Sequence, residues 1–237
     1  MQLLLLSNSR TPDGGFLTHA AEQIHRLFDG TTRLLFIPFA LHDHEEYTRV
    51  VRERFASCGL AVEKLAAGPA ASDAIEEAEA LFVGGGNTFR LLEAIQRFHL
   101  IEPIRRRARA GMPYLGSSAG TVMAGPTIRT TNDMPIIQPA SFKALGLVPF
   151  QINCHYLEPD PRSRHMGETR DQRITEFLEE DPTQVIGLRE GAMLEVSGGP
   201  GAPLEVRLAG TAGARVFRRG LRPTEHAPGG LLDLPAV

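Results

Sequence analysis

Residues 113–120 read Pro113-Tyr114-Leu115-Gly116-Ser117-Ser118-Ala119-Gly120, a short apolar run followed by a serine among small residues. This pattern predicts a strand that turns sharply into a helix at Ser118, because only small neighbours leave room for so tight a turn. The serine hydroxyl would stand above the edge of a sheet, and the helix would point the Ala119 N–H at any oxygen attacked there. The stretch therefore predicts a nucleophile elbow, although an ordinary glycine-rich turn fits the same pattern.

Apolar runs that predict buried strands alternate along the chain with segments whose apolar residues recur at helical spacing. The strand candidates are apolar on both faces, so we expect an α/β fold with a mostly parallel sheet covered by helices on both faces. Short runs at hairpin spacing between residues 185 and 217 predict an antiparallel extension of one edge near the C-terminus. The alternating candidates are strands 3–6, 34–38 and 80–83 and helices 17–28, 47–58 and 89–95.

The length of 237 residues fits a single large domain, which we place at residues 1–220. The remaining residues, 221–237, are rich in proline and glycine and are expected to form a loosely ordered tail. Lys and Arg number 25 against 28 Asp and Glu, and this mild balance offers no electrostatic footprint for nucleic acid or an anionic membrane. No apolar run approaches the roughly 20 residues of a membrane span. We expect a cytoplasmic protein, and base rates for soluble oligomers favour a homodimer.

Only two cysteines occur, Cys58 and Cys154, and they are too far apart to form a Cys-x-x-Cys pair. This spacing argues against a disulfide framework or a zinc ribbon, so both are expected to be buried thiols. A metal site built on Cys154, His155 and distant carboxylates is a weaker alternative, because no pair of ligands has helical or hairpin spacing.

A second strand end carries three glycines in the run Gly84-Gly85-Gly86-Asn87-Thr88. Ligands of parallel sheets bind beyond the carboxyl ends of the strands, so this loop and the Ser118 turn are expected to meet. A free N–H of Gly86, or of Gly85, would complete the oxyanion hole begun by Ala119. The alternative is a nucleotide loop, but these glycines lack the Gly-x-Gly-x-x-Gly spacing and a following Lys-Ser/Thr pair.

A serine hydroxyl is a weak nucleophile at neutral pH, so a base must take its proton, and histidine has a suitable intrinsic pKa. Of eight histidines, His155 stands apart because it ends the apolar run 150–154 and would lie at a strand terminus beside the other loops. A core histidine that only makes hydrogen bonds is the ordinary alternative.

The base needs an acceptor for its second ring N–H, and two carboxylates qualify. Asp133 lies in a polar loop shortly after the elbow, while Glu190 follows the apolar run 185–188 at another expected strand end. Asp133 would also suit a turn or a helix cap, and Glu190 a surface ion pair with Arg189. The residues alone leave both choices open.

Several separate blocks, in order along the chain, resemble the peptidase E family, the alpha-aspartyl dipeptidases. The match runs from residue 2 to about residue 218, and a string of blocks is far more specific than the elbow alone. The blocks are LLLLSNS at 3–9, FIPFA at 36–40, VGGGNTF at 83–89, GSSAG at 116–120, PTIRTTNDMPI at 126–136, QIN at 151–153 before His155, and GETRDQR at 167–173.

The resemblance implies a serine-type dipeptidase that cleaves after an N-terminal aspartate, on a fold similar to class I glutamine amidotransferases, with no metal or other cofactor. It implies Ser118 as nucleophile and His155 as base, with Glu190 or Asp133 as the third member. We prefer Glu190 beside His155, with Asp133 organising its loop. The chain departs from the family at Ser117, where a bulky aromatic is usual, and at Cys154, where proline more commonly precedes the histidine.

An acidic dipeptide calls for a fixed cation, because a buried carboxylate without a partner is costly and a guanidinium suits it best. Arg170 is our candidate, with Arg129 in reserve, and Asn87 and Thr88 are also expected to contact the substrate. As an ordinary surface residue, Arg170 would lie in the first turn of a helix, where a cation gains nothing from the helix dipole.

Two other functions compete with a dipeptidase. One is a non-catalytic protein that binds a small molecule on the same fold. The other is an amidase or a hydrolase of polymeric aspartate chains, which would use the same serine.

Overall fold

The structure is a computed structural model that describes residues 1–12, 14–158, 162, 166–199 and 203–234. A seven-stranded sheet lies at its centre. Its strand order is β3 (Ala61–Lys64), β2 (Arg33–Ile37), β4 (Ala80–Val83), β5 (Tyr114–Ser117), β1 (Gln2–Leu6), β8 (Ala192–Ser197) and β9 (Glu205–Gly210). The strands from β3 to β1 are parallel, whereas β8 is antiparallel to β1 and to β9.

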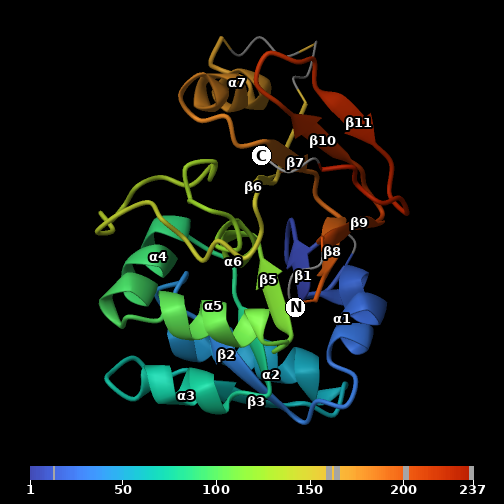
Figure 1. The fold of residues 1–237 in the computed structure, drawn as a ribbon. Coiled ribbons are helices and arrows are strands. Elements are labelled where there is room, and N and C mark those ends of the chain that lie inside the picture. The colour runs from blue at the N-terminus through green and yellow to red at the C-terminus, as the bar shows by residue number, and fades with distance from the viewer. Residues whose placement is uncertain (13, 159–161, 163–165, 200–202, 235–237) are drawn as a thin grey trace.

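Helices cover both faces of this sheet (Figure 1). One face carries the 3-10 turn Thr18–Ala20, α1 (Ala21–Leu27) and α2 (His44–Ala56), and the other carries α3 (Ala71–Glu77), α4 (Thr88–Arg97), α5 (Ile101–Arg109) and α6 (Ala119–Val122). Side chains alternate along a strand, so Leu4 and Leu6 enter one core while Leu3 and Leu5 enter the other. The predicted α/β class, with a mostly parallel sheet between two helical layers, is confirmed.

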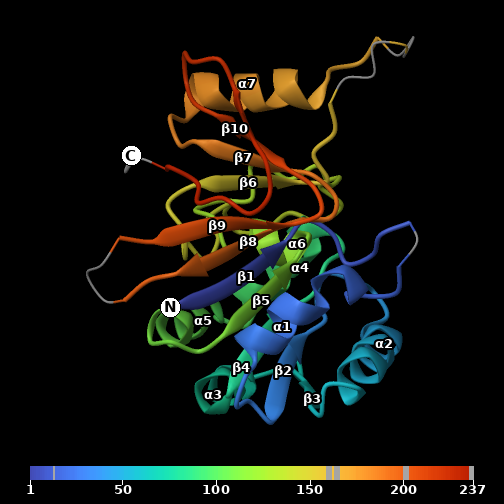
Figure 2. The ribbon, with the colours of Figure 1, turned by 90° about the vertical axis from the view of Figure 1, so that its right-hand side faces the viewer.

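A second sheet has the strand order β11 (Thr224–His226), β10 (Ala214–Phe217), β7 (Val185–Leu188) and β6 (Gln151–Cys154). It lies between α7 (Arg170–Glu180) and the main sheet (Figure 2). The predicted antiparallel extension exists as β8 and β9, but β7 and β10 belong to this second sheet instead. That part of the prediction is wrong, because strand length and apolar pattern do not say with which neighbour a strand pairs.

The segment after Gly220 is held in place over residues 221–234. Its strand β11 pairs with β10, and the Leu232 N–H donates to the carbonyl of Val206 in β9 at 2.8 Å. Leu232 itself is buried in the core. The prediction of a loosely ordered tail is therefore wrong for these residues, because the glycines form turns, such as Gly229 at φ 95°, between paired segments. Residues 235–237 lie outside the described residues.

The carboxyl ends of β4, β5 and β1 lie side by side, so the loops that begin at Gly84, Ser118 and Ser7 leave the same edge of the sheet. The Ser7 hydroxyl accepts a hydrogen bond from the His155 N–H at 2.9 Å, which joins the end of β6 to this edge. Sites in parallel sheets collect at such an edge. In the part of the chain that the structure describes, each helix is too short or too polar to cross a bilayer.

Candidate active site

Ser118 lies in the turn between β5 and α6 with φ 50° and ψ −107°, a conformation that residues with a side chain rarely adopt. The neighbouring glycines make the turn feasible. A Cβ on Gly116 would lie 2.7 Å from the Gly120 carbonyl oxygen, and one on Gly120 would lie 2.1 Å from that of Val83. The predicted passage from strand through tight turn to helix is therefore present, with its serine at the strained position.

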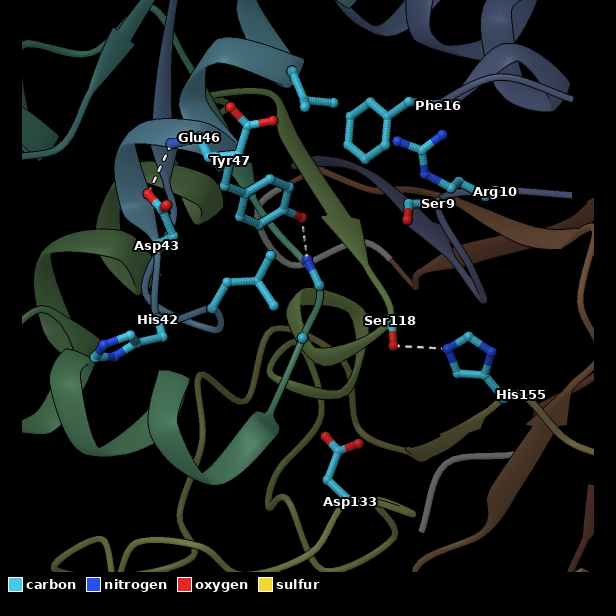
Figure 3. Close-up of a pocket in the computed structure, with 14 residues that line it drawn as sticks. Ser9, Arg10, Phe16, His42, Asp43, Glu46, Tyr47, Ser118, Asp133 and His155 are labelled. Carbon is cyan, nitrogen blue, oxygen red and sulfur yellow. Dashed lines mark hydrogen bonds between the residues drawn. The ribbon is translucent and has the colours of Figure 1, made fainter.

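Three side chains form a continuous hydrogen-bonded chain at this edge. Ser118 Oγ lies 2.9 Å from His155 Nε2 (Figure 3), and His155 Nδ1 lies 2.7 Å from Glu190 Oε1. A carboxylate at Nδ1 keeps the proton on that nitrogen, so Nε2 is left free to accept the serine proton. Of the two carboxylates that the sequence left open, the structure places Glu190 against the histidine.

Asp133 has a different set of partners. Its Oδ2 accepts hydrogen bonds from the Thr88 N–H at 2.7 Å and from the Thr88 hydroxyl at 2.5 Å. Asn87 caps α4 through Oδ1 and donates from Nδ2 to the carbonyl of Met134 at 2.9 Å. These contacts fasten the Asp133 loop to the start of α4, and Asp133 lines the same pocket as Ser118.

Asn87 and Thr88 do not line that pocket among its described residues, so the structure does not show their predicted contacts with substrate. Thr88 is buried, and both of its polar groups bind Asp133. The physical reason is local: Asn87 Oδ1 caps α4, while Asn87 Nδ2 and the Thr88 donors hold the loop of Asp133 and Met134.

Backbone N–H groups are available beside the serine. The Gly85 N–H donates to the Tyr47 hydroxyl at 2.9 Å, whereas the Gly86 N–H has no acceptor within the described residues. Ala119 is the first residue of α6, so its N–H has no partner inside the helix. Of the two glycines left open by the sequence, the structure favours Gly86 as the donor that accompanies Ala119.

Ser7 and Asn8, at the end of β1, support the loops that carry the histidine and the glutamate, and the sequence analysis gave them no role. Besides receiving the His155 N–H, Ser7 donates to the carbonyl of the last β7 residue at 2.7 Å. Asn8 Oδ1 accepts from the N–H of Gly191, the residue after Glu190, at 2.8 Å. Both side chains are buried. The available signal was a pair of polar residues directly after an apolar strand, where buried groups need partners.

Ser118, His155 and Asp133 line a pocket of about 700 Å³. The wall opposite Asp133 comes from the loop after β1, which includes Arg10, and from the start of α2. Figure 3 shows this wall above the serine and Asp133 below it. The sequence analysis did not single out Arg10, because an isolated arginine in a polar loop carries no pattern.

Arg170, the predicted cation, is the first residue of α7 and is not among the described residues that line this pocket. The next residue, Asp171, accepts a hydrogen bond from the hydroxyl of Tyr156 at 2.5 Å. Since Tyr156 follows His155, α7 begins beside the strand end that carries the histidine. Burial lowers the pKa of Arg170, aided by the charge of Arg173, and no carboxylate pairs with Arg170 among the described residues.

Arg129, the reserve candidate, is already engaged. It forms an ion pair with Asp181 at 3.1 Å, and its guanidinium carbon lies 4.9 Å from the centre of the Phe177 ring. It is not among the described lining residues of the serine pocket.

Both cysteines are free thiols. Cys154 is buried, its Sγ lies 3.6 Å from the Ser118 carbonyl oxygen, and burial raises its pKa. Cys58 is only partly buried, so the prediction of a buried thiol is confirmed for Cys154 alone. Ser117 is fully buried and does not line the described pocket. Within the described residues, we find no gathering of three or more His, Cys, Asp or Glu that could hold a metal ion.

A serine at a strained strand-to-helix turn, bonded to a histidine that is bonded to a carboxylate, has the side-chain geometry of serine hydrolases. Comparison with known proteins narrows this class. A profile of peptidase family S51 matches residues 3–202, and the chain belongs to this family of peptidases.

Named relatives cover nearly the whole chain. Peptidase E of Streptomyces coelicolor is 51% identical over 229 residues, which are 97% of this chain and 92% of the relative. A probable alpha-aspartyl dipeptidase of Drosophila melanogaster is 46% identical over 235 residues, or 98% and 95% of the two chains.

Solved structures share the fold at low sequence identity. A putative peptidase E from Listeria monocytogenes has a TM-score of 0.66 at 22% identity, over 89% of this chain and 98% of the other. A peptidase from an acI-B1 Actinobacterium has a TM-score of 0.72 at 16% identity, over 98% and 96%.

Proposed function

We propose that this peptidase is a serine-type dipeptidase that hydrolyses dipeptides with an N-terminal aspartate through an acyl-enzyme. The hydrogen-bonded chain from Ser118 through His155 to Glu190 carries the proposal of mechanism. The proposal of substrate is supported by the relative named a probable alpha-aspartyl dipeptidase.

In the acylation step, Ser118 Oγ bonds to the scissile carbonyl carbon while its proton passes to His155 Nε2. The imidazolium that forms is stabilised by Glu190, whose carboxylate lies 2.7 Å from Nδ1. The N–H groups of Gly86 and Ala119 donate to the oxyanion of the tetrahedral intermediate.

The intermediate collapses when the carbon–nitrogen bond breaks and His155 gives its proton to the departing amine. This leaves an aspartyl ester on Ser118. A water molecule then loses a proton to His155 and attacks the ester, and the serine takes that proton back as aspartate leaves.

Two groups are proposed to recognise the aspartyl residue. Both Thr88 donors bind Oδ2 of Asp133, so Oδ1 has no partner among the described residues and is available to the substrate's ammonium group. Arg170 remains our proposal for the aspartyl side chain, because it is partly buried without a carboxylate partner in the described part of the chain. The guanidinium N–H donors of such an arginine would be satisfied by a substrate carboxylate.

A panel of four dipeptides tests this function: Asp-Leu, Glu-Leu, Asn-Leu and N-acetyl-Asp-Leu. We expect kcat/KM for Asp-Leu to exceed that of each other compound by roughly 100-fold or more, since each leaves a polar group of the site unpaired or crowded. Equal rates for Asp-Leu and Asn-Leu would contradict recognition of the carboxylate. Equal rates for the acetylated compound would contradict recognition of the free amine.

The competing functions are not favoured, because the family profile and the named relatives are those of peptidases. We also propose a cytoplasmic location, which two free cysteines support, since thiols stay reduced in that compartment.

A further inference from the structure

Arg10 is the only Lys or Arg among the described residues that line the serine pocket. Its guanidinium carbon lies 5.6 Å from the centre of the Phe16 ring, and no carboxylate pairs with it within the described residues. The Asn8 side-chain amide donates to the Arg10 carbonyl, so the backbone at this position is tied to a residue that also supports the Glu190 loop. Among the described residues, the pocket therefore contains a cation without a counterion, on a backbone that a side-chain hydrogen bond holds in place.

The acidic residues on the same wall are already occupied. Glu46 accepts two hydrogen bonds from Arg49, each at 2.7 Å, through its two carboxylate oxygens. Asp43 accepts the N–H of Glu46 at 2.9 Å as the cap of α2. Neither carboxylate is engaged with Arg10, so a substrate carboxylate is the natural partner for its guanidinium.

The residues at the two ends of the pocket, Asp133 and Arg10, indicate in which direction a dipeptide would lie across Ser118. Figure 3 shows Asp133 and Arg10 on opposite sides of the Ser118–His155 pair. If Asp133 binds the ammonium group, as the proposed function holds, the aspartyl residue lies on its side of the serine. The leaving residue then extends toward Arg10 and the apolar side chains of Phe16 and Val50.

We propose that Arg10 binds the C-terminal carboxylate of the leaving residue, and that this contact favours free dipeptides over substrates without that carboxylate. The inference rests on the proposed function. In a dipeptide with an apolar second residue, this carboxylate is the only anionic group on the leaving side. Phe16 and Val50 lie on the same wall and would receive the apolar side chain.

The test compares kcat/KM for Asp-Leu and Asp-Leu amide, which differ in the C-terminal carboxylate. We expect the parent enzyme to prefer the acid by roughly 10-fold, the scale of one charge-assisted contact at a partly exposed site. Arg10→Gln should reduce the preference to within about 2-fold, and Arg10→Lys, which keeps the charge, should retain part of it. Arg97→Gln is the matched control, because Arg97 is also exposed and lies 4.8 Å from a neighbouring phenylalanine ring outside this pocket.

An Arg10→Gln enzyme that keeps the full preference for the acid would overturn the inference. So would an equal loss of activity on both substrates, or a loss of discrimination between Asp-Leu and Asn-Leu, which would place Arg10 at the aspartyl side chain. A failure of the proposed function looks different, because the parent enzyme would then hydrolyse neither the acid nor the amide.

Discussion

Ser7 and His155 lie 148 positions apart in the sequence, yet the buried Ser7 hydroxyl accepts the His155 N–H at 2.9 Å. The same hydroxyl donates to the carbonyl of Leu188, two residues before Glu190, at 2.7 Å. One small side chain directly after β1 of the main sheet thus joins the ends of β6 and β7 in the second sheet. The site depends on this junction, because the serine belongs to one sheet and its histidine to the other.

Replacing Ser7 by alanine leaves the partly buried His155 N–H without this partner, and leaves the buried Leu188 carbonyl with the Tyr156 N–H alone. We expect a loss of about 1–3 kcal/mol in the free energy of unfolding. We also expect kcat to fall by roughly 10-fold with little change in KM, because the histidine loses its position but substrate contacts remain. Denaturant unfolding and steady-state kinetics check both values. Ser57→Ala, at an exposed hydroxyl directly after α2, is the control, and a Ser7→Ala enzyme that matches it contradicts the account.

The two carboxylates of the site should separate in kinetics. Glu190→Gln removes the charge that stabilises the imidazolium, so kcat should fall by roughly 100-fold or more while KM changes little. Asp133→Asn should chiefly raise KM, since Asp133 is the proposed partner of the substrate's ammonium group and holds its own loop against Thr88. The reverse pattern, with kcat lost in Asp133→Asn and retained in Glu190→Gln, would exchange their roles.

Tyr47 holds the loop of residues 84–86 in place, because its buried hydroxyl accepts the Gly85 N–H at 2.9 Å. Tyr47→Phe leaves this N–H unsatisfied, at an expected cost of about 1–3 kcal/mol in the free energy of unfolding. The neighbouring Gly86 N–H should then be held less firmly, so kcat should fall several-fold. Unchanged kcat in a destabilised Tyr47→Phe enzyme would show that the loop is positioned by other contacts.

Glu79 provides a prediction about pH. Hydrogen bonds from the side chain of Arg33 and from the backbone N–H of Thr32 lower the pKa of this carboxyl from 4.5 to about 2. A lowered folded-state pKa means that the ionised group stabilises the protein above pH 4.5, and that this contribution disappears as the pH falls toward 2. The difference in unfolding free energy between the parent and Glu79→Gln should therefore shrink as the pH falls from about 7 to about 3. A difference that stays constant over this range would refute the assignment.

Much of the fold could be predicted from local sequence. The apolar runs around Leu3–Leu6 and Ala80–Val83 are buried strands, and the spacing of Tyr47, Val51 and Phe55 forms a helical face. The small residues around Ser118 encode its turn directly, because Gly116 and Gly120 have no space for a side chain. These features depend on neighbours in sequence, which a single chain displays.

What could not be predicted depends on distant partners. The choice between Glu190 and Asp133 required knowing that β6 and β7 are adjacent and parallel. The division into two sheets and the pairing of β11 with β10 have the same cause. Arg10 was missed because its place beside Ser118 follows from the adjacency of β1 and β5, which the sequence does not show. The expected homodimer stays a prediction.

The central claim is that Ser118 is the nucleophile and His155 the group that takes its proton. Turnover of Asp-Leu by Ser118→Ala tests it most directly. The account predicts that kcat falls by roughly 10⁴-fold or more in a folded protein that still binds the dipeptide, because the replaced hydroxyl forms the acyl-enzyme. Hydrolysis by Ser118→Ala at the parent rate would contradict it.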